Sequence, residues 1–455
     1  MRIGIIGIRR IRITGVLAAA CVVAIAATHA EAAQAGSGTS IGTTVAIATP
    51  APAAAPQPQS MGLAVGGAVV QGGDSCASVL PYLADYARRG QLRVGCFSPG
   101  ETQSKAADSL SALSADLVAA PASAGPVWCS TSGDNEWWYT RFSACLSNAP
   151  VTYEEYDSKG RKELGTASLS VSQDIELEPT SSTWEESDHV SVKKVTGDVR
   201  TLEIGFTASC SSPCSTENAS PWAGLQPIQE GETLSGTIAY KDSPTRSPNY
   251  IERRYELEIT QPGTVPTKPY VNWAGPVTLR CDNLVGNSPG CVVPAYTPTF
   301  DVPLSQWGAA AATYAWVQTM LPDHWGSFTA EKPLHRLATY ARQKANRDKI
   351  CRDGTWRKDP AVPNDSCDEY PFAATYESGP MLGLRGSQCA EIEPEKVGGQ
   401  WDVKLLNAAA VTKAARCVRG HVPGPQNTAA GGALGNFATE QRLVDYDPYW
   451  VRITP

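Results

Sequence analysis

Two short polar segments near the end of the chain carry side chains that could hydrolyse an ester bond. Residues 367–376 place the adjacent carboxylates Asp368 and Glu369 between a cysteine and a proline. Residues 419–432 contain an arginine, a histidine and the amide of Asn427, followed by a run of small residues. A carboxylate can take a proton from water, and carboxylate and amide oxygens suit a hard cation. Together the two segments indicate metal-assisted hydrolysis.

The same segments resemble the secreted NucA/NucB deoxyribonuclease family. CDEYPFAATYESG, residues 367–379, is similar to the DEYPF core of that family. VPGPQNTAAGGALGNF, residues 422–437, is similar to its downstream motif of an asparagine followed by small residues. The resemblance covers about the last third of the chain. It implies a small ββα-metal (His-Me finger-like) nuclease domain, in which a base on a strand faces a metal ligand on the following helix.

The resemblance also implies roles for individual residues. Asp368 is expected to be the base, in the place where related nucleases usually have histidine, and Asn427 the principal metal ligand. Glu369 is expected to support catalysis or the metal, because successive side chains of an extended strand point to opposite faces. Gln426 and Glu440 are weaker ligand candidates, and Mg²⁺ or Mn²⁺ is the expected cofactor. The alternative is structural: Asp368 could cap a turn or pair with an arginine, and Asn427 could be a helix N-cap.

A basic segment precedes the acidic one. Residues 331–358 hold nine basic and three acidic side chains, and apolar residues recur within residues 334–350 at roughly helical spacing. We expect four basic side chains to share exposed faces of one helix: Arg336, Lys344, Arg347 and Lys349. Such a face either contacts DNA phosphates or is simply solvated. His421 is a further candidate for phosphate contact, with a structural role as its alternative.

The N-terminus and the cysteines indicate an exported protein. Residues 1–35 read as a signal peptide with a basic start and an apolar centre, and the Arg9-Arg10 pair leaves twin-arginine export as an alternative. Twelve cysteines remain beyond Cys21, and an even number in an exported chain indicates disulfides. We predict bridges between nearest neighbours: Cys76–Cys96, Cys129–Cys145, Cys210–Cys214, Cys281–Cys291, Cys351–Cys367 and Cys389–Cys417.

Amino-acid composition, residue pattern and charge divide residues 36–455 into three regions. Residues 36–126 read as an Ala/Pro/Gly-rich tether with a short helical segment. Residues 127–305 contain short alternating runs typical of an antiparallel β-sandwich-like accessory domain. Residues 306–455 are expected to form the nuclease domain, giving an α+β protein overall. Residues 36–305 carry 17 Lys+Arg and 28 Asp+Glu, whereas residues 306–455 carry 17 and 16, so only the C-terminal part is charge-balanced.

The sequence therefore predicts a secreted, metal-dependent endonuclease that acts on DNA, with RNA as a possible substrate. No stretch beyond the signal is long and apolar enough to predict a membrane span, so stable membrane association is not expected. The alternative is a secreted binding or surface protein whose nuclease-like domain is catalytically inactive.

Overall fold

The computed structural model describes residues 44–46, 59–61, 76–99, 134–266, 270–275 and 277–455. Within those ranges, no helix has the length and hydropathy that crossing a membrane requires. The predicted signal peptide and much of the predicted tether lie outside the described residues.

Long alternating sequences form a large, mostly antiparallel sheet in the β-rich part of the chain. The strand order is β14-β3-β5-β6-β7-β11-β9, with β4 paired to β5 and β2 paired to β4, and the β14–β3 pair is parallel. The strands of this sheet are β2 (Gln59–Met61), β3 (Arg93–Pro99), β4 (Glu136–Tyr139), β5 (Ser143–Asp157), β6 (Lys162–Glu176), β7 (Thr183–Val195), β9 (Ser215–Thr216), β11 (Thr233–Lys241) and β14 (Val265–Pro266).

Two smaller sheets complete the β-rich part. One has the order β10-β8-β13-β15, formed by β10 (Gln226–Ile228), β8 (Leu202–Cys210), β13 (Arg253–Thr260) and β15 (Tyr270–Ala274). The other has the order β12-β16-β17, formed by β12 (Asn249–Ile251), β16 (Leu279–Asp282) and β17 (Gly290–Val292).

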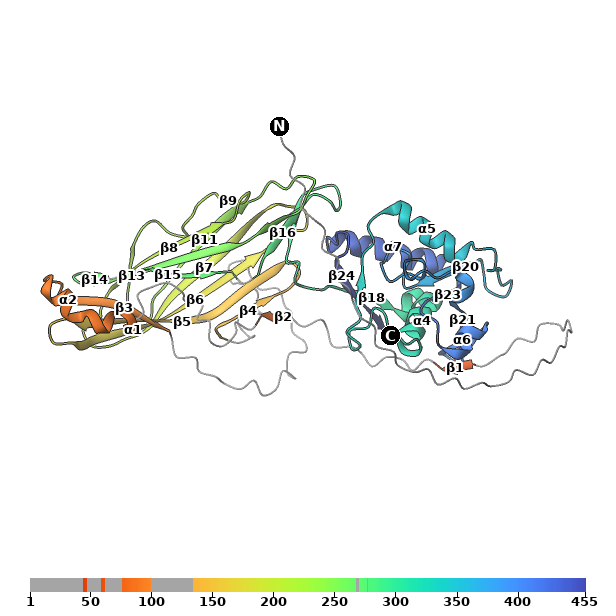
Figure 1. Ribbon diagram of the computed structural model, residues 1–455, viewed down its shortest axis with the longest axis horizontal. Coiled ribbons are helices and arrows are strands. Elements are labelled where there is room, and N and C mark those ends of the chain that lie inside the picture. Colours follow the sequence, from red (N-terminus) through yellow and green to blue (C-terminus); the bar gives the residue numbers. More distant parts are fainter. Residues whose placement is uncertain (1–43, 47–58, 62–75, 100–133, 267–269, 276) are drawn as a thin grey trace, which may run out of the picture. The chain divides into compact units, whose positions relative to one another are not determined.

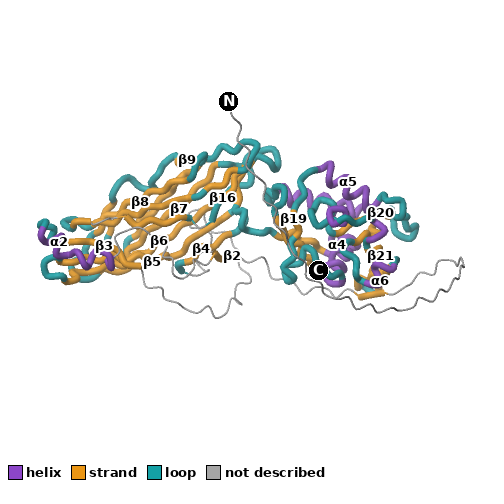
Figure 2. Tube along the Cα trace, in the orientation of Figure 1, coloured by secondary structure: helices purple, strands orange, loops and turns teal. Residues whose placement is uncertain are grey.

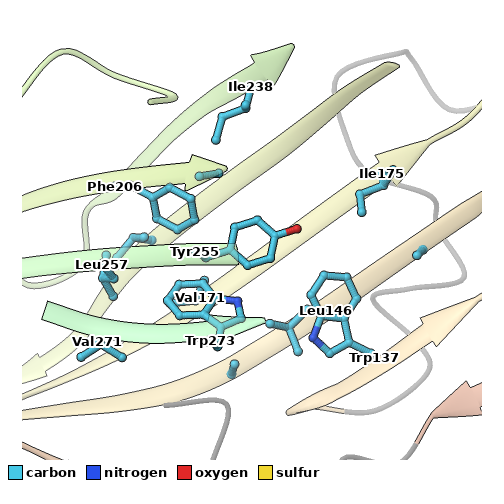
Figure 3. Packing of buried hydrophobic residues seen from close by; sticks show 14 of the residues in the cluster. Trp137, Leu146, Val171, Ile175, Phe206, Ile238, Tyr255, Leu257, Val271 and Trp273 are labelled. Atoms are coloured by element: carbon cyan, nitrogen blue, oxygen red, sulfur yellow. The ribbon is translucent and has the colours of Figure 1, made fainter. Parts of the chain in front are cut away.

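The nine-stranded and four-stranded sheets share one hydrophobic core. Leu146 and Val171 of the large sheet belong to the same buried cluster as Phe206, Tyr255 and Trp273 of the smaller one (Figure 3). The aromatic rings pack directly, with the Tyr255 and Trp273 centroids 5.4 Å apart. Because side chains alternate along each strand, one face of each sheet enters this core. The sandwich-like arrangement predicted from the alternating runs is therefore observed.

The region predicted as a tether contributes more structure than expected. The helical segment is present as α1 (Cys76–Val79), the 3₁₀ turn η1 (Leu80–Tyr82) and α2 (Leu83–Arg88). In addition, β3 pairs with β5 of the large sheet, and β1 (Thr44–Ala46) pairs with β22 (Gln400–Leu405) of the C-terminal part. Both pairings join segments distant in sequence, which local composition does not reveal.

The C-terminal part has its own hydrophobic core, and helices are concentrated there (Figure 2). Its five-stranded sheet has the order β1-β22-β21-β23-β20. The strands of this part are β18 (Thr299–Pro303), β19 (Leu334–His335), β20 (Asp365–Tyr370), β21 (Ala390–Val397), β22 (Gln400–Leu405), β23 (Val418–Pro423) and β24 (Pro448–Thr454). The helices are α4 (Leu304–Met320), α5 (Tyr340–Cys351), α6 (Ala408–Thr412) and α7 (Gly424–Glu440), with 3₁₀ turns η2 (Gly379–Leu382) and η3 (Gly386–Gln388). This core begins with Phe300, slightly before the predicted boundary at residue 306.

Helix α4 is the buried element of the C-terminal part and contacts β20, β21, β23 and α7 (Figure 1). Its centre is a run of alanines, Ala309–Ala312, that are almost wholly buried. Small side chains let the helix approach the sheet closely: a Cβ added at Gly420 of β23 would lie 2.7 Å from the Thr313 hydroxyl of α4. The same face of the sheet carries Asp368, so α4 determines the surroundings of the predicted base.

Five of the six predicted disulfides are confirmed. The structure joins Cys76–Cys96, Cys210–Cys214, Cys281–Cys291, Cys351–Cys367 and Cys389–Cys417. Cys145 is also disulfide-bonded, and Cys129, its predicted partner, lies outside the described residues.

Candidate functional site

The two motif segments form neighbouring strands. β20 pairs antiparallel with β23, which places Asp368 opposite Gly420 and Glu369 opposite Arg419. β20 ends at Tyr370 because the next residue, Pro371, has no backbone N–H to continue the ladder. Side chains alternate along β20, so Ser366, Asp368 and Tyr370 share the face toward α4. The opposite face carries Asp365, Cys367 and Glu369.

Asp368 lies almost completely buried beneath α4. Its side chain is 5% exposed, and its Oδ2 has no hydrogen-bond partner among the described residues. Burial raises the pKa of Asp368 well above its ordinary value, and the charge of Glu369 raises it further. A hydrogen bond with the side chain of Tyr314 of α4 lowers the pKa of Asp368, but by less than burial raises it. An unpartnered buried carboxylate oxygen is costly unless something binds it. A water molecule, a cation or a proton would satisfy this atom.

Asn427 lies in the first turn of α7 and is bonded to the strand that carries Asp368. Its Nδ2 donates to the Ser366 hydroxyl at 2.9 Å and to the Cys367 carbonyl at 3.0 Å. These bonds orient the amide by its nitrogen and leave the carbonyl oxygen Oδ1 as the atom that could coordinate an ion. Ser366 is two residues from Asp368 on the same face, about 6.6 Å along the strand. The structure therefore brings the predicted base and the predicted principal ligand to the same stretch of β20.

Gln426 and Glu440, the two weaker ligand candidates, are not bonded to β20 as Asn427 is. The Gln426 Oε1 atom accepts a hydrogen bond from the Ala309 backbone at 2.8 Å. The side chain also packs against Gly308, where α4 kinks with a φ of +46°. Glu440 is exposed at the far end of α7, thirteen residues or about 20 Å from Asn427. Gln426 thus joins α7 to α4, and Glu440 cannot share an ion with Asn427.

Glu369 lies on the opposite face of β20 from Asp368, as alternation predicts. Its side chain is 12% exposed, and its Oε1 is 3.5 Å from Nε of Arg347 on α5. Burial raises the pKa of Glu369 to about 7, and the positive charge of Arg347 only partly counteracts this. Glu369 also lies with Cys351 and Cys367 in a cluster whose donor atoms are within 4.8 Å of one another. The two sulfurs are joined in a disulfide, so they offer no thiolate and this cluster does not fit a metal ion.

His421 is held inside a charged cluster that sequence reasoning did not assemble. Its Nδ1 is 2.7 Å from Oδ2 of Asp365, and its Nε2 is 3.2 Å from Oε1 of Glu391. Trp356 stacks on the imidazole with centroids 5.0 Å apart and an angle of 18° between the rings. Burial lowers the pKa of His421, but the hydrogen bonds with Glu391 and Asp365 outweigh it and raise the pKa overall. With 3% of its surface exposed, His421 does not face a DNA strand in this arrangement.

The sequence contained one signal for this cluster. Residues alternate along an extended strand, so a strand over residues 365–370 would have placed Asp365 on the face opposite Asp368. The contribution of Glu391 has no such local signal, because β21 joins β23 as a parallel neighbour through a non-local crossover.

The predicted basic helix is shorter than expected, and the prediction that Arg336 lies on it is wrong. α5 begins at Tyr340, because the preceding segment is extended: β19 pairs with β24, and Arg336 forms an isolated bridge with Thr375. Arg336 is half-buried, and this burial lowers the pKa of its guanidinium.

The other three predicted cations do lie on α5. Lys344 pairs with Asp348 at 2.6 Å, and Arg347 pairs with Glu369. Lys349 is exposed, and no ion pair involves it among the described residues. The helix therefore presents Lys344 and Lys349 to solvent, whereas Arg347 turns its charge toward β20.

These strands and helices lie within a segment recognised by its sequence. Residues 324–452 match the family model for Deoxyribonuclease NucA/NucB. This part of the chain is a NucA/NucB domain. The match contains β20, β23, α5 and α7, and its family indicates a nuclease.

Outside the NucA/NucB domain, the comparisons add no argument. No curated protein matches the chain. The native alpha-2-macroglobulin of E. coli is 10% identical with a TM-score of 0.17, and the match covers 46% of this chain and 13% of that one. A mutant alpha-2-macroglobulin of Salmonella is 8% identical with a TM-score of 0.18, covering 42% of this chain and 13% of that one. Likenesses with such low TM-scores carry no conclusion about fold or function.

The α4 side of the NucA/NucB domain offers oxygen donors of the kind that a hard divalent cation prefers. Asp368 offers an unpartnered carboxylate oxygen, and Asn427 offers an amide oxygen whose nitrogen is already bonded. Mg²⁺ and Mn²⁺ prefer such oxygen ligands and commonly keep several waters. Gly420, directly opposite Asp368, contributes no side chain, and Thr313 of α4 packs against it there.

Proposed function

We propose that the protein is an exported, metal-dependent endonuclease that hydrolyses phosphodiester bonds of DNA. The observation that carries this proposal is Asp368, a buried carboxylate with an unpartnered oxygen, on the strand to which the Asn427 amide is bonded. This arrangement lies inside a NucA/NucB domain. The confirmed disulfides support export, because such bridges persist in oxidising compartments.

In this proposal β20, β23 and α7 act as the ββα unit of the catalytic centre. β20 supplies the base, β23 pairs with it, and α7 follows β23 directly and supplies the ligand. Asp368 takes a proton from water as the water oxygen attacks the phosphorus, and the phosphorus–oxygen bond to the leaving sugar breaks. A raised pKa makes the ionised Asp368 carboxylate a stronger base than a free aspartate. Cleavage should therefore increase as pH rises through the pKa of Asp368.

Asn427 would hold the divalent cation, and Asp368 would remain free to act as the base. A bound divalent cation supplies stabilisation of the negative charge that develops on the phosphate and on the departing oxygen. α7 itself assists, because the free N–H groups and the positive end of the helix dipole at its N-terminus favour a phosphate. Lys344 and Lys349 on α5 add a positive surface for the DNA backbone.

The test is cleavage of supercoiled plasmid by the purified mature protein, with Mg²⁺, with Mn²⁺ and with chelator. Nicked and linear products that disappear with chelator are expected for an endonuclease. Asp368→Asn should reduce the rate about a hundredfold or more while the protein stays folded, which is the usual scale for losing a general base. Asp402→Asn, an aspartate of β22 in the same sheet, is the matched control and should cleave like wild type. Near-normal cleavage by folded Asp368→Asn would remove Asp368 from the mechanism.

A second candidate function is DNA binding by a catalytically inactive NucA/NucB domain of a surface protein. The 5% exposure of Asp368 and the close packing of Thr313 on Gly420 favour it, because both restrict access to the site. Wild-type protein that binds DNA but cleaves neither DNA nor RNA with either metal would establish this alternative.

A further inference from the structure

A basic connection between α5 and β20 forms an ordered surface that the proposed mechanism does not use. We call residues 352–364 the strap. The Cys351–Cys367 disulfide closes its base by joining the end of α5 to β20. Arg357 and Lys358, at its centre, are exposed.

Trp356 anchors the centre of the strap to the sheet. Its ring stacks on the His421 imidazole, which two carboxylates hold from both nitrogens. Neither carboxylate can donate a proton when ionised, so a doubly protonated imidazolium satisfies both contacts. A cationic ring beneath Trp356 also favours the stack through the negative face of the indole. Trp356, the residue before Arg357, is therefore held in a fixed position.

Further contacts fix the strap on either side of Trp356. Arg419 of β23 binds Asp353 at 3.3 Å and the Thr355 hydroxyl at 2.8 Å. Beyond the centre, the Asp359 backbone N–H donates to Oδ2 of Asp365 at 2.7 Å. Arg357 and Lys358 thus project from between two anchored positions. Holding them in place reduces the conformational entropy that these side chains would lose on binding.

Arg352 of the strap pairs with Asp348 at 3.2 Å, whereas Arg357 and Lys358 form no ion pair among the described residues. Among the described residues, the one hydrogen bond of the Arg357 guanidinium goes to the neighbouring Trp356 carbonyl, and Lys358 has no ion pair. The carboxylate of Asp353 is already paired with Arg419. Two adjacent free cations on a rigid segment are suited to consecutive phosphates of a nucleic acid backbone.

The far end of the strap lies beside the proposed catalytic centre. The Asn364 carbonyl accepts a hydrogen bond from the backbone N–H of Gly424, the first residue of α7, at 3.1 Å. Asn427 lies in that same first turn. Because Trp356 stacks on His421, the centre of the strap lies on the face of β20 and β23 opposite Asp368, and its far end is the part that adjoins α7.

We propose that the strap is a DNA-backbone contact surface in which Arg357 and Lys358 each bind one phosphate. This inference rests on the proposed function, because it assumes that DNA is the substrate. It adds the place where the duplex lies outside the catalytic centre, and it gives the His421 cluster a purpose: Trp356 and His421 position the two cations.

The experiment measures binding of the mature protein to a short labelled DNA duplex by fluorescence anisotropy, in chelator so that no cleavage occurs. Affinity is recorded between about 50 and 200 mM salt, and the log–log slope counts the phosphates neutralised. Arg357→Gln/Lys358→Gln should flatten that slope by about two, since each phosphate contact contributes about 0.9. Lys193→Gln/Lys194→Gln removes the same charge from exposed residues of β7 and should leave the slope unchanged.

The outcomes separate this inference from the proposed function. If Arg357→Gln/Lys358→Gln keeps the wild-type slope while the wild type binds and cleaves DNA, the strap is not a contact surface and the nuclease proposal stands. An equal loss of slope in the β7 control would show general charge attraction and would also overturn the inference. If the wild type does not bind DNA at all, the proposed function and the inference both fail.

Discussion

Glu369→Gln provides a quantitative test of the strand pair, because burial and ionisation oppose each other at this residue. The carboxyl group lies on the α5 side of β20 with 12% of its side chain exposed, 3.5 Å from Arg347. Burial raises its pKa to about 7 from 4.5, despite Arg347. The folded protein therefore disfavours the ionised form of Glu369 that the unfolded chain adopts readily.

The sign and size of the effect follow from proton linkage. Below pH 4.5 the carboxyl is protonated in both states and contributes no pH dependence. Between pH 4.5 and about 7 the unfolded chain loses the proton first, so the free energy of unfolding of the wild type falls as pH rises. At 1.36 kcal/mol per pKa unit the full loss is about 3 kcal/mol, reached above pH 7. Glutamine cannot ionise, so Glu369→Gln should lack this loss.

The assay is urea unfolding of wild type and Glu369→Gln across this pH range, with disulfides intact. The unfolding free energy of the mutant minus that of the wild type should increase by up to about 3 kcal/mol between pH 4.5 and 7 and then level off. Glu440→Gln, at the exposed end of α7, controls for removal of one carboxylate from this part of the chain. A Glu369→Gln difference that is independent of pH would refute the reasoning, because it would mean that Glu369 is ionised in the folded protein throughout.

The same substitution should alter catalysis in a defined direction. The charge of Glu369 is one cause of the raised pKa of Asp368. Removing it should lower the pKa of Asp368 and shift the acid side of the kcat/KM profile to lower pH, with cleavage retained. A profile that does not move would separate Glu369 from the proposed base.

Two further substitutions test the ligand and the framework. Asn427→Ala should weaken metal-dependent cleavage, and the activity should recover partly at higher Mg²⁺. Asn436 is exposed on the same helix, so the metal titration of Asn436→Ala should match that of wild type. Identical metal titrations for the two variants would dismiss Asn427 as the ligand. Cys389→Ser/Cys417→Ser opens a loop of 28 residues and should cost about 3–4 kcal/mol in the unfolding free energy, measured by urea unfolding against wild type; a loss below about 1 kcal/mol would contradict the chain-entropy argument.

The sequence by itself determined the features that depend on neighbouring residues. Alternation with a period of two predicted strands such as β6 and β8, because the pattern of a half-buried strand is local. The nearest-neighbour disulfides followed from short separations, which make closure of each loop probable. The motifs around Asp368 and Asn427 predicted the NucA/NucB domain, because the acidic residues and the asparagine each lie in a contiguous segment of recognisable sequence.

Tertiary structure decided which environment each of those residues meets. Asp368 and Glu369 are adjacent in sequence, yet one lies beneath α4 and the other meets Arg347 of α5. Nothing in the sequence near residue 368 states which face of β20 a helix will cover. The helical spacing of residues 334–350 likewise did not reveal that β19 would pair with β24 and delay the start of α5.

The His421 cluster shows the physical reason most directly. Asp365 and Glu391 lie 56 and 30 residues from His421 and reach it only because β21, β23 and β20 are neighbours in one sheet. Burial and ion pairing depend on contacts between distant segments, and local patterns carry no record of those contacts. The types of chemical groups are thus readable from the sequence, whereas their pKa values, partners and accessibility arise when the sheet and its helices pack together.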